Sequence, residues 1–276
     1  MPRLAVIGFP VGHSRSPAMH NAALETLGLA PEWSYEAIEA APGAFAARVR
    51  AMADEGFVGA NVTIPHKEAA LALAGDHASP AAREIGAANT LSFGPGGADG
   101  QGPDAELVPV FADNTDAGGL LAALGRTPLD ARALVLGAGG AARAAVWALV
   151  GEGARVDVWN RTAGRAEALC ADLGGTSVAS PAQDAYDLIV NTTAVGLRGE
   201  DPFADLPLDA SGFGAGQLVV DMVYGERPSA LLAAAAEAGA ATVDGIEVLV
   251  QQGALSLELW TGREAPIEVM RAAARG

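Results

Sequence analysis

The stretch LVLGAGGAARAAVWAL, residues 134–149, decides the fold of this chain. It places Gly137, Gly139 and Gly140 directly after an expected strand and before an expected helix. Strand, glycine turn and helix in this order form a dinucleotide-binding unit, in which the pyrophosphate lies at the helix N-terminus. Ala142 stands in the third glycine position, which the fingerprint allows. The flanking strand and helix favour this reading over a tight turn that binds nothing.

The residues after the second strand of this unit indicate which dinucleotide is bound. Asn160 lies 23 positions after Gly137, near the ~20-residue spacing at which NAD enzymes carry Asp or Glu for the ribose hydroxyl. Here the chain reads NRTAGR, with Arg161 and Arg165 around Thr162, the expected N-cap of the next helix. Arginine in a first turn opposes the helix macrodipole but suits a phosphate. We therefore predict NADP rather than NAD; two solvated surface arginines are the alternative.

Runs of β-forming residues alternate with helical stretches along the whole chain. The expected strands lie at residues 4–8, 33–38, 59–64, 133–138, 155–160, 187–192 and 218–224. This alternation indicates parallel sheets with helices on both faces, and hence an α/β fold class. We predict two domains. Residues 1–114 and 246–276 form an α/β substrate domain with a mostly parallel sheet, and residues 115–245 form a doubly wound, Rossmann-type NADP domain.

Composition limits the classes of function. The chain has 276 residues, of which 50% are hydrophobic and 18% charged, enough for a globular protein with two cores. Its net charge of −16 argues against a general affinity for nucleic acid or anionic membranes. Cys170 is the only cysteine, which suits a reducing cytoplasm. The glycine-rich stretch 94–104 is expected to be a surface hairpin loop without chemistry.

Lys67 is placed unusually within NVTIPHKEAA, residues 61–70. The stretch begins as a strand, and Pro65 suits the first position of a following helix, so Lys67 falls in a first helical turn. The macrodipole is positive there, and an acidic residue would be the stabilising choice. A solvated surface lysine is the alternative on this stretch alone.

A second helix start, in GHSRSPAMHN, offers a seat for an anion. Ser16 before Pro17 is the expected N-cap, and Ser14 adds a second hydroxyl just upstream. Two hydroxyls and the free N–H groups of a helix start can hold a carboxylate, although an ordinary capped helix is equally compatible. The four histidines show no metal-ligand spacing, so we predict no metal site.

Nine motifs follow one another in the order GHSRSPAMHN, NVTIPHK, GAANTL, DNTD, GAGGAAR, NRTAGR, NTTAVG, DMVY and DGIEVLVQQG. Together they resemble the shikimate dehydrogenase family over nearly the whole chain. The resemblance implies reversible reduction of 3-dehydroshikimate to shikimate by NADPH, on the chorismate route to the aromatic amino acids. Its partner would be a small-molecule substrate, and we predict a cytoplasmic monomer or homodimer that binds neither nucleic acid nor membranes.

The resemblance also implies residue roles. Lys67 and Asp116 match the family's catalytic pair. The family's groups that bind the substrate carboxylate match Ser14, Ser16 and Tyr224. Its groups that bind the ring hydroxyls match Asn61, Thr63, Asn89 and Gln252. Each buried hydroxyl left unpaired would cost roughly 1–3 kcal/mol. The implied cofactor residues are Gly137, Ala138, Gly139, Gly140, Ala141, Asn160, Arg161, Thr162, Arg165, Thr193, Val195 and Gly245.

The chain departs from the family pattern at three places. It reads NTDAGG where NTDG is common, carries Val248 where a methionine is usual, and continues DMVY with GERPS rather than asparagine and proline. The first and third leave the local turns open, and the second implies looser packing at the nicotinamide. None of the three removes a reacting group.

Three alternatives remain beside this reading. An NAD-dependent quinate or quinate/shikimate dehydrogenase is disfavoured by the arginine pair and more weakly by the two serines. A binding module without catalysis would be expected to lack Lys67 or Asp116. Another NADP oxidoreductase would lack the serine seat and the set of asparagines and glutamine.

Overall fold

The computed structural model describes residues 1–94, 108–225 and 228–276, so the predicted loop at 94–104 lies outside it apart from Gly94. The chain forms two compact units. The first unit contains Met1–Thr115 and Gln252–Gly276, and the second contains Asp116–Gln251. These boundaries lie one and six residues beyond the predicted ones. Within the described ranges, no helix is long and apolar enough to cross a membrane.

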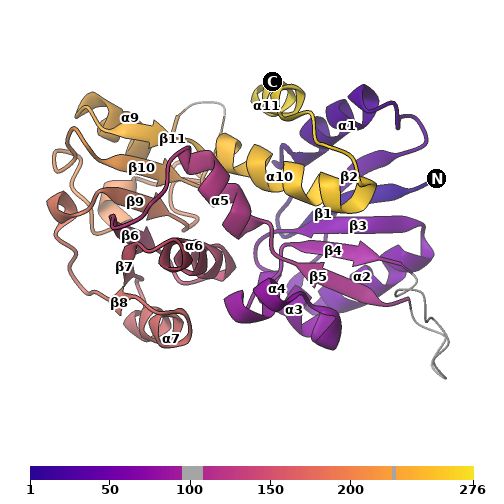
Figure 1. The fold of residues 1–276 in the computed structure, drawn as a ribbon, viewed down its shortest axis with the longest axis horizontal. Coiled ribbons are helices and arrows are strands. Elements are labelled where there is room, and N and C mark those ends of the chain that lie inside the picture. The colour runs from indigo at the N-terminus through magenta and orange to yellow at the C-terminus, as the bar shows by residue number, and fades with distance from the viewer. Residues whose placement is uncertain (95–107, 226–227) are drawn as a thin grey trace. The chain divides into compact units, whose positions relative to one another are not determined.

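The first unit is built on a five-stranded sheet with the order β2-β1-β3-β4-β5 (Figure 1). Its strands are β1 (Arg3–Gly8), β2 (Ser34–Glu39), β3 (Phe57–Val62), β4 (Thr90–Phe93) and β5 (Val110–Asp113). The pairs β1–β2 and β1–β3 are parallel, whereas β3–β4 and β4–β5 are antiparallel, so this sheet is mixed and not mostly parallel as predicted. The two antiparallel strands flank the residues for which we predicted a hairpin.

Helices cover both faces of this sheet. One face packs Ile7, Val62 and Leu91 against α2 (Phe45–Asp54), α3 (Lys67–Ala74) and α4 (Pro80–Ile85). The helices of the other face are α1 (Ser16–Thr26), α11 (Ile267–Arg275) and the C-terminal part of α10 (Gly245–Thr261). On that face the indole N–H of Trp260 donates to the carbonyl of Leu91 at 3.0 Å. Gly59 lets the indole approach, because a Cβ there would overlap it.

The second unit is built on a six-stranded sheet with the order β11-β10-β9-β6-β7-β8, in which every strand pair is parallel. Its strands are β6 (Arg132–Leu136), β7 (Arg155–Trp159), β8 (Thr176–Ser177), β9 (Leu188–Asn191), β10 (Leu218–Asp221) and β11 (Ala241–Val243). The chain runs outward from β6 to β8 and then returns to β9, on the other side of β6. This reversal makes the β6–β9 boundary the topological switch point of a doubly wound sheet.

Both faces of the second sheet are buried, which explains why its central strands are apolar without alternation. One face packs Val135 and Val190 against α5 (Asp116–Leu124), α6 (Gly140–Gly151) and α7 (Ala163–Leu173). Leu134 and Ile189 point to the opposite face, where helix α9 (Ala230–Glu237) packs. The short helix α8 (Pro202–Asp205) lies in the same unit.

Two helix starts differ from the expectation. Helix α1 begins at Ser16 with Arg15 as its N-cap, because the Ser14 hydroxyl accepts from the Ser16 N–H at 3.3 Å and performs the capping role. Helix α3 begins at Lys67 rather than Pro65, because the chain first makes a turn closed by the His66 N–H on the Thr63 carbonyl at 3.0 Å. Lys67 is still in a first helical turn, now as its first residue.

Candidate active site

The carboxyl edge of the second sheet has the geometry of a dinucleotide site. At the β6–β9 switch point, Gly137 follows β6 and Thr192 follows β9. Both the N–H and the hydroxyl of Thr192 donate to the carbonyl of Leu136, at 2.9 and 2.7 Å. Ligands of open α/β sheets bind in the crevice outside such a switch point. The glycine turn and the threonine loop therefore lie side by side where this fold binds its cofactor.

Two glycines at this edge cannot carry a side chain. Gly137 has φ +118°, and a Cβ there would lie 2.5 Å from the Thr192 hydroxyl. A Cβ at Gly245 would lie 2.5 Å from the carbonyl oxygen of Met222. Glycine at both positions keeps the two loops close to the helices that follow β6 and β11, and it leaves backbone N–H groups accessible to a pyrophosphate.

The residues past β7 supply the positive charge that a ribose phosphate needs. Arg161 and Arg165 are exposed and have no ion-pair partner within the described part of the chain. Between them, Thr162 is the N-cap of α7, as predicted, although its hydroxyl makes no capping hydrogen bond. The side chain of Asn160 instead donates to the Thr162 carbonyl at 2.9 Å and fixes the turn. These donors fit a phosphate on the adenosine half of a dinucleotide.

Buried amides and hydroxyls form a compact cluster in the first unit. Asn89 is 1% exposed, and its Nδ2 donates to the Thr115 hydroxyl at 3.0 Å and to Oε1 of Gln252 at 3.1 Å. Its Oδ1 accepts from the N–H of Thr115 at 2.7 Å and from the hydroxyl of Thr90 at 3.1 Å. The structure thus joins Asn89 and Gln252, which the sequence separates by 163 positions.

Asn61 belongs to the same cluster from the neighbouring strand. The Tyr35 hydroxyl donates to its Oδ1 at 2.7 Å, and Ser256 donates to the same oxygen at 3.4 Å. Its Nδ2 donates to the hydroxyl of Thr90 at 3.4 Å. The amide is thereby oriented before any ligand binds, so little entropy is lost on binding.

The backbone of Lys67 is hydrogen-bonded to the residue that precedes Asn89 of this cluster. Its carbonyl accepts from the N–H of Ala88, the residue before Asn89, at 2.9 Å. Lys67 is also the only lysine in the chain, in which the other 16 of the 17 Lys and Arg residues are arginines. Arginine stays protonated in proteins, whereas lysine can give up its proton. Lys67 is therefore the one side chain among these 17 that could release a proton.

The other predicted substrate residues are divided between the units. Ser14 and Ser16 lie at the start of α1, and Ser16 is 2% exposed. Thr63 follows β3 in the same unit and donates its N–H to the Ile7 carbonyl at 2.9 Å. Asp116 and Tyr224 belong to the second unit. Asp116 is the first residue of α5 and directly follows Thr115 of the amide cluster.

The sequence interpretation missed several members of the cluster. Thr90 and Thr115 stand inside the motifs GAANTL and DNTD, directly beside residues that were assigned, so a signal existed for both. Tyr35 and Ser256 carry no such signal, because their bonds to Asn61 join positions far apart in the chain.

A buried histidine, His20, packs against Tyr35, the residue that donates to Asn61. His20 is fully buried in α1, its ring stacks on Tyr35 at 4.1 Å between centroids, and neither ring nitrogen has a hydrogen-bond partner among the described residues. Burial lowers the pKa of His20 to about 3, and the neighbouring Asn61 side chain offsets this only in part. The imidazole is therefore neutral at physiological pH and acts as a flat packing surface for Tyr35.

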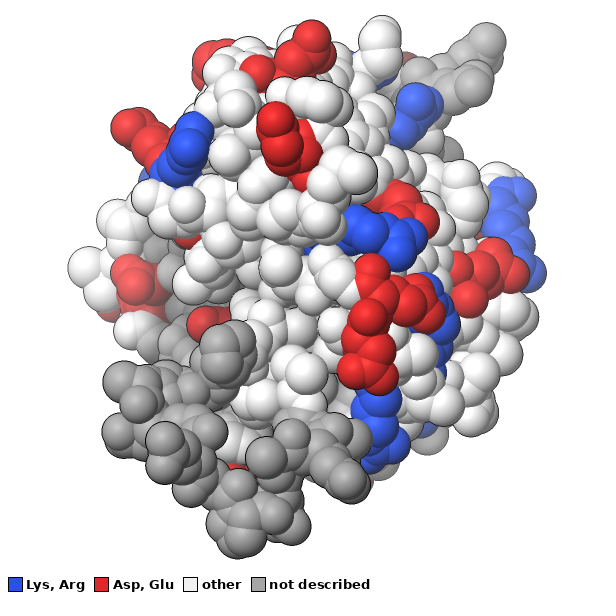
Figure 2. Space-filling model, turned by 90° about the vertical axis from the view of Figure 1, so that its right-hand side faces the viewer, with Lys and Arg blue, Asp and Glu red and all other residues white. Residues whose placement is uncertain are grey.

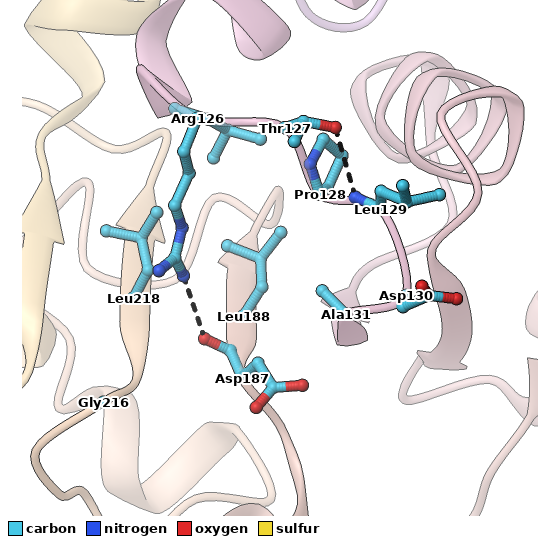
Figure 3. Close-up of a pocket in the computed structure, with 11 residues that line it drawn as sticks. Arg126, Thr127, Pro128, Leu129, Asp130, Ala131, Asp187, Leu188, Gly216 and Leu218 are labelled. Carbon is cyan, nitrogen blue, oxygen red and sulfur yellow. Dashed lines mark hydrogen bonds between the residues drawn. The ribbon is translucent and has the colours of Figure 1, made fainter.

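A cavity of about 330 Å³ opens at the opposite, amino edge of the second sheet (Figure 3). Leu188 and Leu218 line it, and the Arg126 guanidinium donates to the carbonyl of Asp187 at 3.4 Å. None of the predicted site residues lines this cavity. It is therefore distinct from the cofactor edge of the same sheet.

The surface charge agrees with a small-molecule ligand rather than a polyanion. On the face shown in Figure 2, acidic and basic side chains of the described residues are interspersed. Together with the net charge of −16, this leaves the binding of anionic groups to local donors such as the two arginines past β7.

A doubly wound unit with a glycine turn at its switch point and arginines past the second strand, joined to a second α/β unit with a buried polar cluster, defines a two-domain NADP-dependent oxidoreductase. Comparisons with known proteins identify the family. Residues 6–91 match the shikimate dehydrogenase substrate binding domain, residues 123–195 match shikimate / quinate 5-dehydrogenase, and residues 245–275 match the shikimate 5'-dehydrogenase C-terminal domain. The chain belongs to the shikimate dehydrogenase family.

Individual relatives agree over nearly the full length. The chain is 44% identical to shikimate dehydrogenase (NADP(+)) of Methylobacterium radiotolerans, over 95% of this chain and 92% of the relative. It is 45% identical to the enzyme of the same name from Anaeromyxobacter sp., over 97% and 94%. A crystal structure of shikimate 5-dehydrogenase from Thermus thermophilus in complex with NADP(H) and shikimate matches with TM-score 0.84 and 44% identity, covering 100% of this chain and 99% of that one. The predicted fold class, family and cofactor are confirmed.

Proposed function

We propose that this protein catalyses the reversible reduction of 3-dehydroshikimate to shikimate by NADPH, with Lys67 and Asp116 as its catalytic pair. The observation that carries the assignment of this pair is the buried cluster of Asn89, Thr115 and Gln252. Lys67 is tied to it through the Ala88 N–H, and Asp116 directly follows Thr115 in the chain. The backbone of Lys67 and the position of Asp116 in the chain, next to Thr115, support this proposal.

The cluster supplies donors and acceptors for a ring that carries several hydroxyls. Asn61, Thr63, Asn89 and Gln252 would pair with these hydroxyls, because a buried hydroxyl without a partner costs roughly 1–3 kcal/mol. Ser14 and Ser16 at the start of α1 would hold the carboxylate, where free N–H groups and the positive helix end favour an anion. Tyr224 would add a third hydroxyl to the carboxylate.

Reduction of the ketone needs a hydride at its carbon and a proton at its oxygen. When bound, NADPH supplies a hydride to the ketone carbon of the substrate. Negative charge then builds on the ketone oxygen, and a proton from the Lys67 ammonium would neutralise it and form the new hydroxyl. Asp116 would hold the ammonium in place and stabilise its charged form, so that the two groups act as one coupled proton donor. In the reverse direction the neutral lysine takes the hydroxyl proton.

The second unit would hold the cofactor by its two halves. Gly137, Ala138, Gly139, Gly140 and Ala141 would surround the pyrophosphate. The adenosine phosphate would lie against Asn160, Arg161, Thr162 and Arg165. Thr193, Val195 and Gly245 would border the nicotinamide half. In this assignment the first unit is the substrate domain and the second the NADP domain.

We infer a cytoplasmic enzyme that acts as a monomer or a homodimer in the synthesis of chorismate and the aromatic amino acids. A single cysteine, Cys170, supports a reducing compartment, since the chain contains no pair to form an internal disulfide. Size-exclusion chromatography with light scattering would distinguish one chain from two.

Initial rates of dinucleotide reduction test the proposal. We expect the wild-type protein to reduce NADP with shikimate faster than NAD with shikimate, and to prefer shikimate to quinate. A preference for NAD or quinate would keep the family but contradict the argument from Arg161 and Arg165. No turnover with any of the four pairs would contradict the proposed function and favour a binding module without catalysis.

Two variants of Lys67 separate proton transfer from charge. Lys67→Ala should lower kcat by about 10²–10⁴-fold, the usual contribution of a positioned acid. Lys67→Arg keeps a positive charge but cannot release a proton, so it should be nearly as slow. Arg50→Ala removes an exposed cation of α2 and is the matched control. Near-wild-type kcat in Lys67→Arg would show that charge alone suffices, against the role proposed here.

A further inference from the structure

A buried carboxylate to which no role was assigned above organises the carboxyl edge of the second sheet. Asp221 ends β10 and is 1% exposed. One of its oxygens accepts from Nδ2 of Asn191 at 2.9 Å and from the N–H of Val223 at 3.1 Å. The other accepts from the hydroxyl of Ser229 at 2.5 Å. All three donors are neutral groups on separate segments of the edge.

The bond from Asp221 to Asn191 fixes the orientation of the asparagine amide. A carboxylate only accepts hydrogen bonds, so it must face the Nδ2 side of the amide and turn Oδ1 away. That Oδ1 accepts from both the N–H and the hydroxyl of Thr193, at 3.0 and 2.7 Å. The Thr193 hydroxyl in turn accepts from the N–H of Val195 at 3.1 Å. A chain of hydrogen bonds therefore runs from Asp221 to Val195.

The backbone next to Asp221 connects the same two loops, which follow β9 and β10. The Met222 N–H donates to the Asn191 carbonyl at 3.0 Å, and Met222 is the residue against which Gly245 packs. Gly137 packs on the other side against Thr192 and Thr193. Asp221 thus links the loops after β9 and β10 to the two glycines that border the cofactor edge.

We propose that Asp221 is a positioning residue for the nicotinamide half of NADP, acting through Asn191 on Thr193 and Val195. The proposal rests on the proposed function, which places that half of the cofactor against these two residues. An apolar side chain would fill the same buried position without the cost of desolvating a carboxylate. Burial raises the pKa of Asp221, and the bonds from Ser229, Val223 and Asn191 offset this only in part. In return for this desolvation cost, the Asp221 carboxylate fixes the conformation of the loop that contains Thr193 and Val195.

Binding measurements with the whole cofactor and with half of it test the proposal. In Asp221→Ala the Asn191 amide loses its acceptor and can rotate, so the Kd for NADP should rise about tenfold, the value of one or two hydrogen bonds. The Kd for adenosine 2',5'-bisphosphate, which lacks the nicotinamide half, should stay within about twofold. Hydrogen exchange at residues 193–195 should be faster in the unliganded variant. Asp221→Asn retains an acceptor for Asn191 and should restore most of the NADP affinity.

The matched control is Asp157→Ala, because Asp157 lies on β7 of the same sheet and also accepts from a hydroxyl, that of Tyr186, at 2.8 Å. It should leave the Kd for NADP unchanged. Should Asp221→Ala fail to fold, Thr193→Val removes only the hydroxyl in the middle of the chain and should weaken NADP binding in the same selective way.

Two results would overturn the inference: an unchanged Kd for NADP in Asp221→Ala, or an equal loss of affinity for NADP and for the bisphosphate. The second would mark a general disturbance of the unit. A wild-type protein that fails to bind NADP would instead contradict the proposed function. If the wild-type protein binds and reduces NADP and Asp221→Ala has the same Kd for NADP, only the role of Asp221 is contradicted.

Discussion

The two units prepare their sites by different means. In the first unit the site is made of side chains that are already buried and bonded to one another, such as Asn61, Asn89 and Gln252, which are 5%, 1% and 7% exposed. In the second unit the predicted cofactor contacts come largely from a glycine turn and from two exposed arginines that are free of ion pairs in the described structure.

This difference between the units indicates which binding residues also stabilise the fold. A buried amide cluster serves the fold and the substrate at once, so a change within it affects both stability and recognition. Exposed arginines past β7 serve only the ligand, so their loss should leave the fold intact. The three predictions below set one unit against the other.

The largest effect is expected for Asn89→Ala. This change removes the acceptor of the Thr115 N–H and one of the donors to Oε1 of Gln252, so the free energy of unfolding should fall by about 3 kcal/mol. The KM for shikimate should rise at least about tenfold, because Asn89 is also a proposed substrate contact. Urea unfolding and steady-state kinetics measure the two effects.

Gln217→Ala is the matched control in the second unit. Gln217 is 8% exposed, and its amide nitrogen donates to the carbonyls of Gln183 and Tyr186, both at 2.9 Å. It should lose comparable stability without changing the KM for shikimate. If both variants raise that KM alike, general destabilisation explains the effect and the comparison between the units fails.

Acid should change the contributions of His20 and Asp221 to stability in opposite directions. The pKa of His20 in the first unit is lowered to about 3, so the unfolded chain binds a proton below about 6.5 that the folded unit refuses. The first unit should therefore lose roughly 2–3 kcal/mol of stability between pH 6.5 and 4.5. The raised pKa of Asp221 in the second unit acts with the opposite sign, because its stabilising effect grows as the carboxyl takes up a proton at low pH.

Hydrogen exchange followed by mass spectrometry resolves this difference, because peptides report on each unit separately. Protection of the first unit's amides from exchange should decrease as the pH is lowered. His20→Gln should weaken this pH dependence because it removes the titrating group. An unchanged pH dependence in His20→Gln would assign the acid sensitivity to another group.

The smallest effects are expected for Arg161→Ala and Arg165→Ala. Each should raise the KM for NADP about tenfold through the loss of a charge-assisted bond to the ribose phosphate, and leave the KM for NAD within about twofold. Arg155→Ala removes an exposed arginine at the amino end of β7 and serves as the control. Equal losses for NADP and NAD would mean that the arginines do not read the phosphate.

The sequence predicted the second unit better than the first because its signals are local. The apolar strands β6, β9 and β10 and the turn at Gly137 are each specified by residues a few positions apart. Within this unit, the two strands without a prediction, β8 and β11, are short, at two and three residues. β11 lies in an alanine-rich stretch that favours helix by propensity.

The first unit shows what local patterns cannot provide. The motifs indicated Asn89 and Gln252 separately, but only folding reveals that one donates to the other. Tyr35 on β2 orients Asn61 on β3, across β1 of the same sheet, and no residue near either position in the chain indicates this bond. Pro65 suggested a helix start two residues too early because the turn closed on Thr63 takes precedence over proline's preference.

Lys67 gives the protein one further property. Because all other basic side chains of the Lys and Arg type are arginines, Lys67 carries the only side-chain amine. An acylating reagent that reacts with primary amines can therefore label no other side-chain amine. The stoichiometry of labelling at this residue, with and without a bound ligand, would count occupied sites directly in a mixture of molecules.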